Sequence, residues 1–550
     1  MPRLQQHDLT KSAGPSFANS ASGTAQFSPP MHLDIPNQLN VATHFIDRHI
    51  GEGRGQKVAF ECGDERVTYS DLLQRVNQAG NALRNLGVRR EERVALLLLD
   101  TPDFAYCFFG GIKIGAVPVP INTLLKPGEY EYMLNDSRAR IVIVSAELLP
   151  QVQAIPRANL EYLETVIVSR GPAMEGNLSL QSLIDAASPE LTAVKTSKDE
   201  PAFWLYSSGS TGFPKGCVHL HHDMVVCAEH YAKAVLGIQE NDRCFSVAKL
   251  FFAYGLGNAL YFPLAVGATS ILWPGSPSPH NIFSVIERHH PTLFFSVPSN
   301  YSSLLSYRRE TAPDFDLSTI RWAVSAGEAL PAPIFHRFKE RFKVEILDAI
   351  GSTEALHMFI ANRPGAVRPG SSGQVIPGYE ARIEDERGNL VADGEIGNLL
   401  ISGDAVCSYY WNQHEKTRQT IQGQWLRTGD KYYRDPDGYY WFVGRSDDML
   451  KVKGMWVSPI EIECAILEHS SVQEAAVIGI ADSNELIKPA AYVVLRDGDN
   501  GSTAKATELM EHLRSRLAPH KCPQSIEFVQ QLPKTATGKI QRYKLRQGAK

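Results

Sequence analysis

The sequence predicts an α/β fold in which parallel sheets are layered with helices. Short runs that are apolar on both faces, such as 94–99 (VALLLL), are typical of interior strands in a parallel sheet. These runs alternate with segments of helical periodicity, as in layered α/β domains. The chain has 550 residues, 43% of them hydrophobic, which suits roughly two to four domains.

The first strong helix signal covers residues 67–87. Its apolar side chains recur at helical spacing on one face, and Gly87 stands where a left-handed residue often ends a helix. The apolar residues of that face are Leu72, Val76, Ala79, Leu83 and Leu86. Further buried strands are predicted at 94–99, 139–145, 165–169, 292–298 and 320–327.

Residues 253–273 carry no charge and are long enough to raise the question of a membrane span. The segment contains Asn258, Pro263 and three glycines, and Lys249 lies just upstream. A buried helix followed by a buried strand at 266–273 explains it better, so no membrane insertion is expected.

A smaller α+β unit is predicted from residue 445 to 550, after a large domain at 31–444. Ser458, Pro459 and Glu461 form the pattern of a capping box, and the helix that follows has an apolar face. Two strands, 474–480 and 490–495, and a helix near 508–517 complete the unit. The charged segment that joins the two parts is suited to a hinge, so the small domain is expected to move.

Composition excludes several function classes. The net charge of −5 gives no basic footprint for nucleic acid. The eight cysteines are scattered without a C-x-x-C pair, which favours free, buried thiols in a reducing, cytoplasmic environment. His219, His221 and His222 fit no common zinc spacing. Residues 1–30 resemble a disordered tail rather than a secretory signal, and an organelle transit peptide remains an alternative.

The strongest chemical signal is the loop 206–216 (YSSGSTGFPKG), which follows an apolar strand. Small hydroxyl residues and glycines let N–H and O–H groups surround phosphate oxygens, and Lys215 adds positive charge. A flexible linker would not need a Pro-Lys-Gly ending, and the spacing is not that of a P-loop NTPase. The residues predicted to bind phosphate are Ser207, Ser208, Gly209, Ser210, Thr211, Gly212 and Lys215.

Six motifs in this order resemble the adenylate-forming superfamily, which includes acyl-CoA synthetases, peptide-synthetase adenylation domains and luciferases. Besides the loop, they are 325–329 (SAGEA), 350–354 (IGSTE), 428–430 (TGD), 444–448 (GRSDD) and 533–539 (PKTATGK). The resemblance covers the chain from about residue 40 to its end. It implies the adenylate-forming enzyme fold, with a large N-terminal domain and a small mobile C-terminal domain.

The resemblance implies roles for these residues. Lys539, Glu354 and Lys215 are the implied catalytic residues, with Glu354 holding Mg²⁺ and Lys539 meeting the charge that develops at the α-phosphate. Asp430 and Arg445 are expected at the ribose hydroxyls. The remaining implied ATP contacts are Gly327, Glu328, Ala329, Asp348, Ala349, Ile350, Gly351, Ser352 and Thr353. Ile350 departs from the aromatic residue usual in the superfamily, so stacking on adenine must be weaker or come from elsewhere.

Within the superfamily, the segments 249–258 (KLFFAYGLGN) and 350–359 (IGSTEALHMF) are similar to the benzoate- and 4-hydroxybenzoate-CoA ligase family. By position, the aryl pocket is expected to be lined by Ala253, Tyr254, Gly327, Ile350 and His357. Tyr254 and His357 are expected to stack on the ring or to donate to a ring hydroxyl. An apolar, ring-lined slot suits a flat aromatic acid.

The family implies coenzyme A as acceptor and an aryl-CoA thioester, AMP and pyrophosphate as products. The small domain is expected to rotate about Asp447 and present Lys453, Gly454 and Trp456 to the CoA channel, although Lys453 replaces a more usual serine. A homodimer is compatible with this interpretation.

Three alternatives remain open at this point. The enzyme could load its aryl acid onto a free-standing carrier protein, or act as a luciferase-like oxygenase, because the fold hosts several chemistries. A catalytically silent homologue would be expected to lose its charged motif residues. Lys215, Glu354, Asp430, Arg445 and Lys539 are all present, which favours an enzyme.

Overall fold

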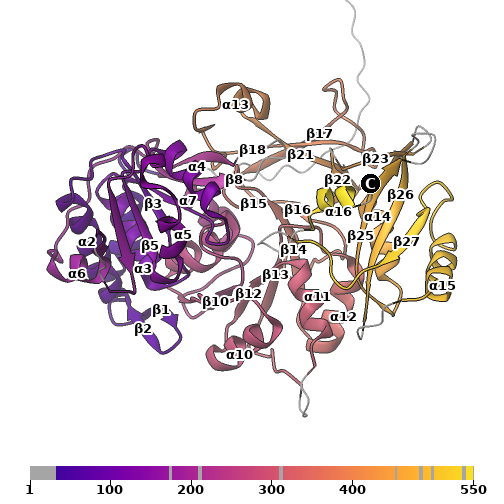
Figure 1. Cartoon of the computed structure of the whole chain (residues 1–550), viewed down its shortest axis with the longest axis horizontal. Coiled ribbons are helices and arrows are strands. Elements are labelled where there is room, and N and C mark those ends of the chain that lie inside the picture. The colour runs from indigo at the N-terminus through magenta and orange to yellow at the C-terminus, as the bar shows by residue number, and fades with distance from the viewer. Residues whose placement is uncertain are drawn as a thin grey trace, which may run out of the picture.

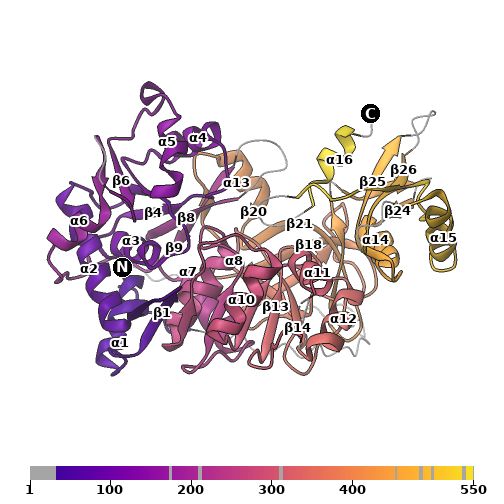
Figure 2. The same cartoon turned by 60° about the horizontal axis from the view of Figure 1, so that its bottom comes forward.

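The computed structural model describes residues 33–172, 176–207, 214–308, 314–446, 448–452, 455–481, 487–496, 501–534 and 540–548. Two sheets flanked by helices, two further sheets and a C-terminal domain make up this part of the chain (Figure 1). Figures 1 and 2 place the C-terminal elements at one end of the long axis, opposite the helices of the N-terminal end. This arrangement confirms the predicted fold class.

The first large sheet is mixed and has the strand order β16-β15-β14-β13-β12-β10-β11-β1-β2. Its interior from β14 to β1 is parallel, and both edges are antiparallel. Its strands are β1 (Val58–Cys62), β2 (Glu65–Thr68), β10 (Arg243–Ser246), β11 (Thr269–Ile271), β12 (Leu293–Ser296), β13 (Trp322–Ser325), β14 (Ile346–Gly351), β15 (Met358–Ala361) and β16 (Gln374–Val375).

The second large sheet is parallel throughout, with the order β4-β3-β5-β6-β7. Its strands are β3 (Arg93–Leu97), β4 (Val117–Pro120), β5 (Ile141–Ser145), β6 (Thr165–Ser169) and β7 (Leu178–Ser179). The predicted apolar runs at 94–99, 139–145 and 165–169 are therefore confirmed as parallel strands, and β3 ends two residues earlier than the run suggested. The runs at 292–298 and 320–327 form β12 and β13 of the first sheet.

Helices pack against both sheets, mainly around three clusters of buried hydrophobic residues. The helices of this region are α1 (Arg48–Gly51), α2 (Tyr69–Asn85), α3 (Pro102–Lys113), α4 (Pro127–Ser137), α5 (Leu149–Gln153), α6 (Leu180–Ala186), α7 (Asp223–Cys227), α8 (Ala253–Leu256), α9 (Phe262–Val266), α10 (Pro279–His289), α11 (Pro298–Ser306) and α12 (Ala332–Phe342). Short 3₁₀ segments lie at Ala146–Leu148 and Arg157–Asn159, and π-helical segments are η1 (Thr43–Asp47), η4 (Ala228–Lys233) and η5 (Gly257–Tyr261).

Helix α2 shows how the sequence determines an element. Thr68 accepts from the backbone of Asp71, whose side chain accepts in return, so a capping box begins the helix. Leu72 and Val76 on the predicted face are fully buried. Gly87 has a φ of +82° just after the helix, a conformation that glycine adopts without a steric penalty. The predicted helix and its end are both confirmed.

The segment 253–273 is a buried helix, α8–η5–α9, followed by β11. This confirms the prediction of a helix and a strand in the core. Among the described residues, no helix combines the length and the apolar character needed to cross a bilayer.

Two further sheets follow, one of three strands and one of five. One has the order β19-β9-β8, with β8 (Pro201–Ser207), β9 (Lys215–Leu220) and β19 (Tyr409–Tyr410). The other has the order β17-β18-β21-β20, with β22 also paired to β21. Its elements are β17 (Tyr379–Glu384), β18 (Gly397–Gly403), α13 (His414–Thr420), β20 (Ile421–Gln422), β21 (Trp425–Arg434) and β22 (Tyr440–Arg445).

The C-terminal domain has its own hydrophobic core around a sheet of order β25-β26-β27. Its elements are β23 (Leu450–Val452), β24 (Met455–Val457), α14 (Pro459–Leu467), β25 (Val472–Ala481), β26 (Ile487–Leu495), α15 (Thr503–Arg514), β27 (Ser525–Phe528) and α16 (Arg542–Gly548). Helices α11 and α12 of the large domain lie beside it (Figures 1 and 2).

Two details of the predicted C-terminal domain need correction. Helix α15 begins at Thr503, after the N-cap Ser502, and ends at Arg514, so the expected helix near 508–517 was displaced toward the C-terminus. Ser458 caps α14 by accepting from the backbone of Glu461, as predicted. However, the Glu461 side chain pairs with Lys521 at 2.7 Å. The ion pair explains why that carboxylate is directed away from the cap.

Candidate active site

A cavity of about 590 Å³ lies between the large domain and the C-terminal domain. Its size is within the usual range of small-molecule sites. Many of the residues predicted from the sequence line it: Ser207, Lys215, Gly327, Glu328, Ala329, Ala349, Ile350, Gly351, Ser352, Thr353, Glu354, Asp430 and Arg445. Helix α14, strand β25 and the residues Lys534, Ile540 and Arg542 line it from the C-terminal domain. The structure thus gathers motifs that are far apart in the sequence.

The ends of two parallel strands form the floor of this cavity. Gly327 follows β13 and has a φ of +93°, a left-handed value that favours glycine. Gly351 ends β14, and a Cβ atom there would lie 2.4 Å from the carbonyl oxygen of His357. Ligands of open α/β sheets bind outside the carboxyl ends of the strands. At that edge, Gly327 allows a left-handed backbone conformation and Gly351 allows close approach of the backbone at His357.

Glu354 is held by two hydroxyl groups. Ser207 Oγ lies 3.1 Å from Glu354 Oε1, and the hydroxyl of Tyr410 donates to the same oxygen at 2.8 Å. Burial, together with the nearby carboxylate of Glu354, raises the pKa of Tyr410 far above its usual range, so the phenol keeps the proton that it donates. The Lys215 Nζ atom lies 4.6 Å from the centroid of the Tyr410 ring. A carboxylate, two hydroxyls and an ammonium group are therefore close together.

This arrangement fits Mg²⁺ bound together with a polyphosphate. Among the described residues, no group of three or more His, Cys, Asp or Glu side chains is placed to hold a metal ion. Mg²⁺ does not need such a cluster, because it usually takes one or two carboxylates, waters and substrate phosphates. Glu354 would supply one hard oxygen ligand at the cavity wall.

Asp430 and Arg445 lie opposite each other on β21 and β22. Arg445 Nη1 donates to Asp430 Oδ1 at 3.0 Å and to the carbonyl of Thr428 at 3.1 Å. Gly429 has a φ of +79°, and a Cβ there would lie 2.9 Å from Arg445 Nη2. The Arg445 side chain is 46% exposed, so this pair adds little to stability but presents a donor and an acceptor to the cavity.

One histidine of the segment 219–222 lies behind the site. His219 lies fully buried between Asp223 Oδ2 and the carbonyl of Thr353, each 2.8 Å from a ring nitrogen. His219 therefore ties β9 to the residue before Glu354.

Asp348 lies beneath the cavity and is not among its lining residues. One carboxylate oxygen accepts from the backbone of Leu330 at 3.3 Å, and burial raises the pKa of Asp348 to about 8. It is therefore protonated at neutral pH. This position does not support the expected direct contact of Asp348 with ATP.

The residues predicted for the acid pocket are divided between two places. Gly327 and Ile350 line the cavity, whereas Ala253, Tyr254 and His357 do not. The Tyr254 hydroxyl lies 3.2 Å from the carbonyl of Ser296 and 3.1 Å from that of Val324. The hydroxyl proton is therefore donated to a backbone carbonyl within the protein, which argues against the expected donation from Tyr254 to a ring hydroxyl of the substrate.

His357 lies deeper, 2% exposed, with its ring 5.8 Å from that of Tyr254. Burial lowers its pKa to about 3, so the imidazole is neutral. Its Nε2 is 3.4 Å from the carbonyl of Tyr254, while the buried Nδ1 has no hydrogen-bond partner among the described residues. An unpaired buried nitrogen is costly, so His357 remains a candidate contact for a substrate that reaches this depth.

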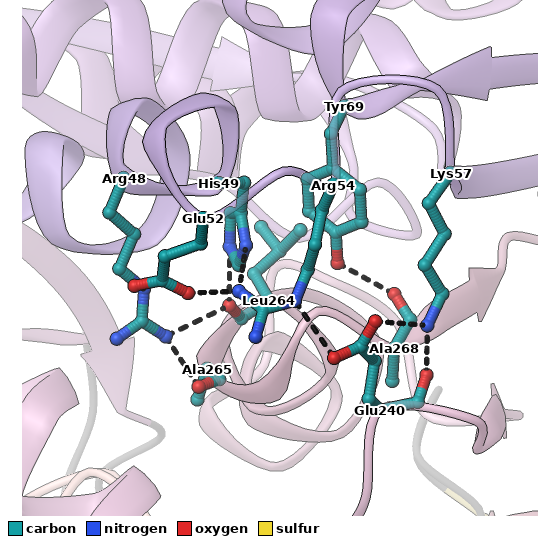
Figure 3. Close-up of polar contacts among 10 residues, drawn as sticks. All are labelled: Arg48, His49, Glu52, Arg54, Lys57, Tyr69, Glu240, Leu264, Ala265 and Ala268. Carbon is teal, nitrogen blue, oxygen red and sulfur yellow. Dashed lines mark hydrogen bonds and ion pairs between the residues drawn. The ribbon is translucent and has the colours of Figure 1, made fainter.

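The helix that carries Tyr254 is anchored at its far end (Figure 3). The guanidinium group of Arg48 donates to the carbonyl of Ala265, and a ring nitrogen of His49 lies 2.8 Å from the carbonyl of Leu264. Cations and donors stabilise the C-terminal end of a helix. The N-terminal segment thus fixes α8–η5–α9 against the core.

Several predicted residues lie outside the described part of the chain: Ser208, Gly209, Ser210, Thr211, Gly212, Asp447, Lys453, Gly454 and Lys539. Trp456 belongs to β24, which pairs with β23. The roles expected for these residues stay predictions.

The contact of Tyr410 with Glu354 was not predicted from the sequence. Tyr410 lies in the two-residue strand β19, which pairs it with Cys217 of β9 and thereby brings it to Glu354. The sequence holds no signal for this contact beyond two adjacent tyrosines at 409 and 410.

Comparison with known proteins agrees with this geometry. The model of the "AMP-binding enzyme" family matches residues 47–411, and that of the "AMP-binding enzyme C-terminal domain" matches residues 461–539. A benzoate–CoA ligase of Thauera aromatica is 48% identical over 94% of this chain and 97% of its own length. A 4-hydroxybenzoate–CoA/benzoate–CoA ligase of Rhodopseudomonas palustris is 45% identical over 92% and 94%.

A solved structure is equally similar. It is an anthranilate–CoA ligase in complex with anthranoyl-AMP, with a TM-score of 0.91 and 46% identity, covering 94% of this chain and 98% of its own. The match of the family models to both domains, together with these relatives, shows that the chain belongs to the family of AMP-binding enzymes.

Proposed function

We propose that the protein is an AMP-forming aryl acid–CoA ligase that acts on benzoate or a hydroxybenzoate. The observation that carries the proposal is the cavity between the domains, where Lys215, Glu354, Asp430 and Arg445 come together. Relatives that match nearly the whole chain are ligases of benzoate, 4-hydroxybenzoate and anthranilate. All three acids are flat aromatic rings with one carboxylate.

In the first half-reaction, the acid carboxylate attacks the α-phosphate of ATP, forming acyl-AMP and releasing pyrophosphate. Lys215 and the loop 208–213 bind the phosphates, and Asp430 and Arg445 bind the ribose hydroxyls. Glu354, oriented by Ser207 and Tyr410, holds Mg²⁺. The bound ion offsets phosphate charge.

Lys539 is proposed to reach the α-phosphate and the attacking carboxylate. A positioned cation stabilises charge that develops in the transition state more than charge in the ground state. The aryl group of the acid is expected against Gly327 and Ile350, with His357 deeper in the protein.

In the second half-reaction, the thiol of CoA attacks the acyl-AMP carbonyl and AMP leaves. The C-terminal domain, from residue 445, is proposed to rotate about Asp447 so that Lys453, Gly454 and Trp456 line the CoA channel. A rotation lets one cavity serve two reactions in turn. A homodimer and a cytoplasmic location remain part of this proposal.

The decisive experiment is a panel of benzoate, hydroxybenzoates, anthranilate, cinnamate and a short fatty acid, with ATP and Mg²⁺. Pyrophosphate release and aryl-CoA formation are measured with and without CoA. We expect a CoA thioester from one or more aryl acids. Glu354→Gln should abolish most activity, and Glu380→Gln, an exposed carboxylate on β17, is the matched control.

Two outcomes would change the assignment. Acyl-AMP formation without any CoA thioester, but with transfer to a carrier protein, would indicate an aryl acid adenylation enzyme. Activity with the short fatty acid alone would overturn the aryl substrate class.

A further inference from the structure

A hydrogen bond connects the large domain to the C-terminal domain across the cavity. Glu328 follows β13 in the large domain, and its Oε1 atom accepts from the backbone N–H of Ile540 at 2.9 Å. Ile540 lies just before α16 and is the next residue after Lys539 in the sequence. Both Glu328 and Ile540 line the cavity.

The chain around Ile540 forms the base of a hairpin. Ile540 pairs with Lys534 in an antiparallel bridge, and the backbone N–H of Gln541 donates to the carbonyl of Pro533 at 2.8 Å. Lys534 also pairs with Glu474 of β25 at 2.7 Å. The base of the hairpin therefore belongs firmly to the C-terminal domain and moves with it.

A second ion pair fixes the other side of the hairpin. Arg542 donates to both carboxylate oxygens of Glu463 at 2.9 Å, and the backbone of Val477 donates to the same group at 2.7 Å. Both contacts of Arg542 come from its Nη2 atom, and hydrogen bonds between charged groups are stronger than those between neutral groups. Burial alone would lower the pKa of Arg542, but the carboxylates of Glu463, Asp448 and Glu328 outweigh it and raise that pKa. Glu328 thus also attracts Arg542, at the start of α16, by charge, although less strongly than Glu463 does.

From this geometry we infer that Glu328 is a latch: a positioning residue that holds the hairpin preceding α16 on the large domain for adenylation and releases it for the CoA step. The inference rests on the proposed two-step function. Since Lys539 is bonded directly to Ile540, a contact that fixes the N–H of Ile540 controls delivery of this lysine to the cavity. A contact made in one domain arrangement and lost in the other shifts the equilibrium toward the first.

The latch differs from a direct ATP contact in its kinetic signature. A latch changes the fraction of enzyme in the adenylating arrangement, so its loss lowers kcat for adenylation and leaves KM for ATP nearly unchanged. Removal of a direct ATP contact would instead raise KM. Since the hairpin must leave before CoA reacts, loss of the latch should slow the second half-reaction much less than the first.

The test uses the full-length enzyme and measures the half-reactions separately. We expect Glu328→Ala to slow benzoyl-AMP formation about tenfold, a loss consistent with one charge-assisted hydrogen bond. Glu328→Gln keeps an oxygen that accepts from Ile540, so it should stay within about threefold of the wild type. Both variants should lose much less of the wild-type rate in the conversion of supplied benzoyl-AMP and CoA than in benzoyl-AMP formation. Glu340→Gln, an exposed carboxylate on α12, is the matched control.

Three results would overturn the inference: equal loss in both half-reactions, a rise in KM for ATP at unchanged kcat, or wild-type adenylation by Glu328→Ala. Failure of the proposed function itself looks different, because the wild-type enzyme would then form no aryl-AMP from any acid.

Discussion

The hydroxyl of Tyr410 is predicted to orient Glu354 for Mg²⁺-ATP. Tyr410 is 2% exposed and donates to Glu354 Oε1 at 2.8 Å. Tyr410→Phe removes this hydrogen bond and keeps the ring beside Lys215. A hydrogen bond to a carboxylate contributes about 1.5–3 kcal/mol, and each 1.4 kcal/mol is about tenfold. Because Ser207 still contacts Glu354, we expect the lower end, about a tenfold loss in kcat/KM for Mg²⁺-ATP.

Exchange of labelled pyrophosphate into ATP, with benzoate and a titration of Mg²⁺, measures this loss. Tyr410→Phe should also need more Mg²⁺ for half-maximal exchange, while it should convert supplied benzoyl-AMP to the CoA thioester normally. Tyr409→Phe, in the same strand and partly exposed, is the control and should behave as the wild type. Exchange within twofold of the wild type and an unchanged Mg²⁺ requirement would refute the role given to Tyr410.

Three further predictions concern single residues. Lys539→Ala should slow aryl-AMP formation by orders of magnitude and spare thioester formation from supplied acyl-AMP, so equal loss in both contradicts its role. Asp348 keeps its proton to about pH 8 in the folded state but loses it near pH 3.9 when unfolded; stability should therefore fall as pH rises between these values. In urea unfolding at pH 5 and pH 8, the free energy of unfolding of Asp348→Asn should differ less between the two pH values than that of the wild type. An equal difference in both proteins would contradict the prediction. Tyr254→Phe should lower the free energy of unfolding by about 1 kcal/mol and leave the ratio of benzoate to 4-hydroxybenzoate turnover unchanged; a shifted ratio would show that the hydroxyl reaches the substrate.

Much of the fold could be predicted because local signals agree with the tertiary structure. The apolar runs that became β3, β5 and β6 are buried on both faces of a parallel sheet, and no other element type suits them as well. Gly87 ends α2 for a local steric reason. The family and the motifs around the cavity were also predicted, and the comparisons confirm the family.

The errors arose where a distant partner decides the outcome. The Glu461 carboxylate pairs with Lys521, sixty positions away, instead of completing its cap. The Tyr254 hydroxyl likewise contacts distant groups, the backbone carbonyls at the ends of β12 and β13, while the place of its ring in the acid pocket stays a prediction. Neither partner can be identified from local sequence spacing.

Tyr410 and the latch at Glu328 illustrate the same limit for the active site. Strand β19 reaches Glu354 only because it pairs with β9. The contact between Glu328 and Ile540 joins residues that are far apart in the sequence and lie on different domains. Motif matching identified Glu328 as an ATP contact but carried no information on what the carboxylate meets across the cavity.

The central claim is that this cavity forms an aryl-adenylate. The most direct test is benzoate-dependent exchange of labelled pyrophosphate into ATP by the wild-type enzyme, with Mg²⁺ and without CoA. The account predicts exchange that requires both an aryl acid and Mg²⁺. Absence of exchange with benzoate, all hydroxybenzoates and anthranilate would contradict it.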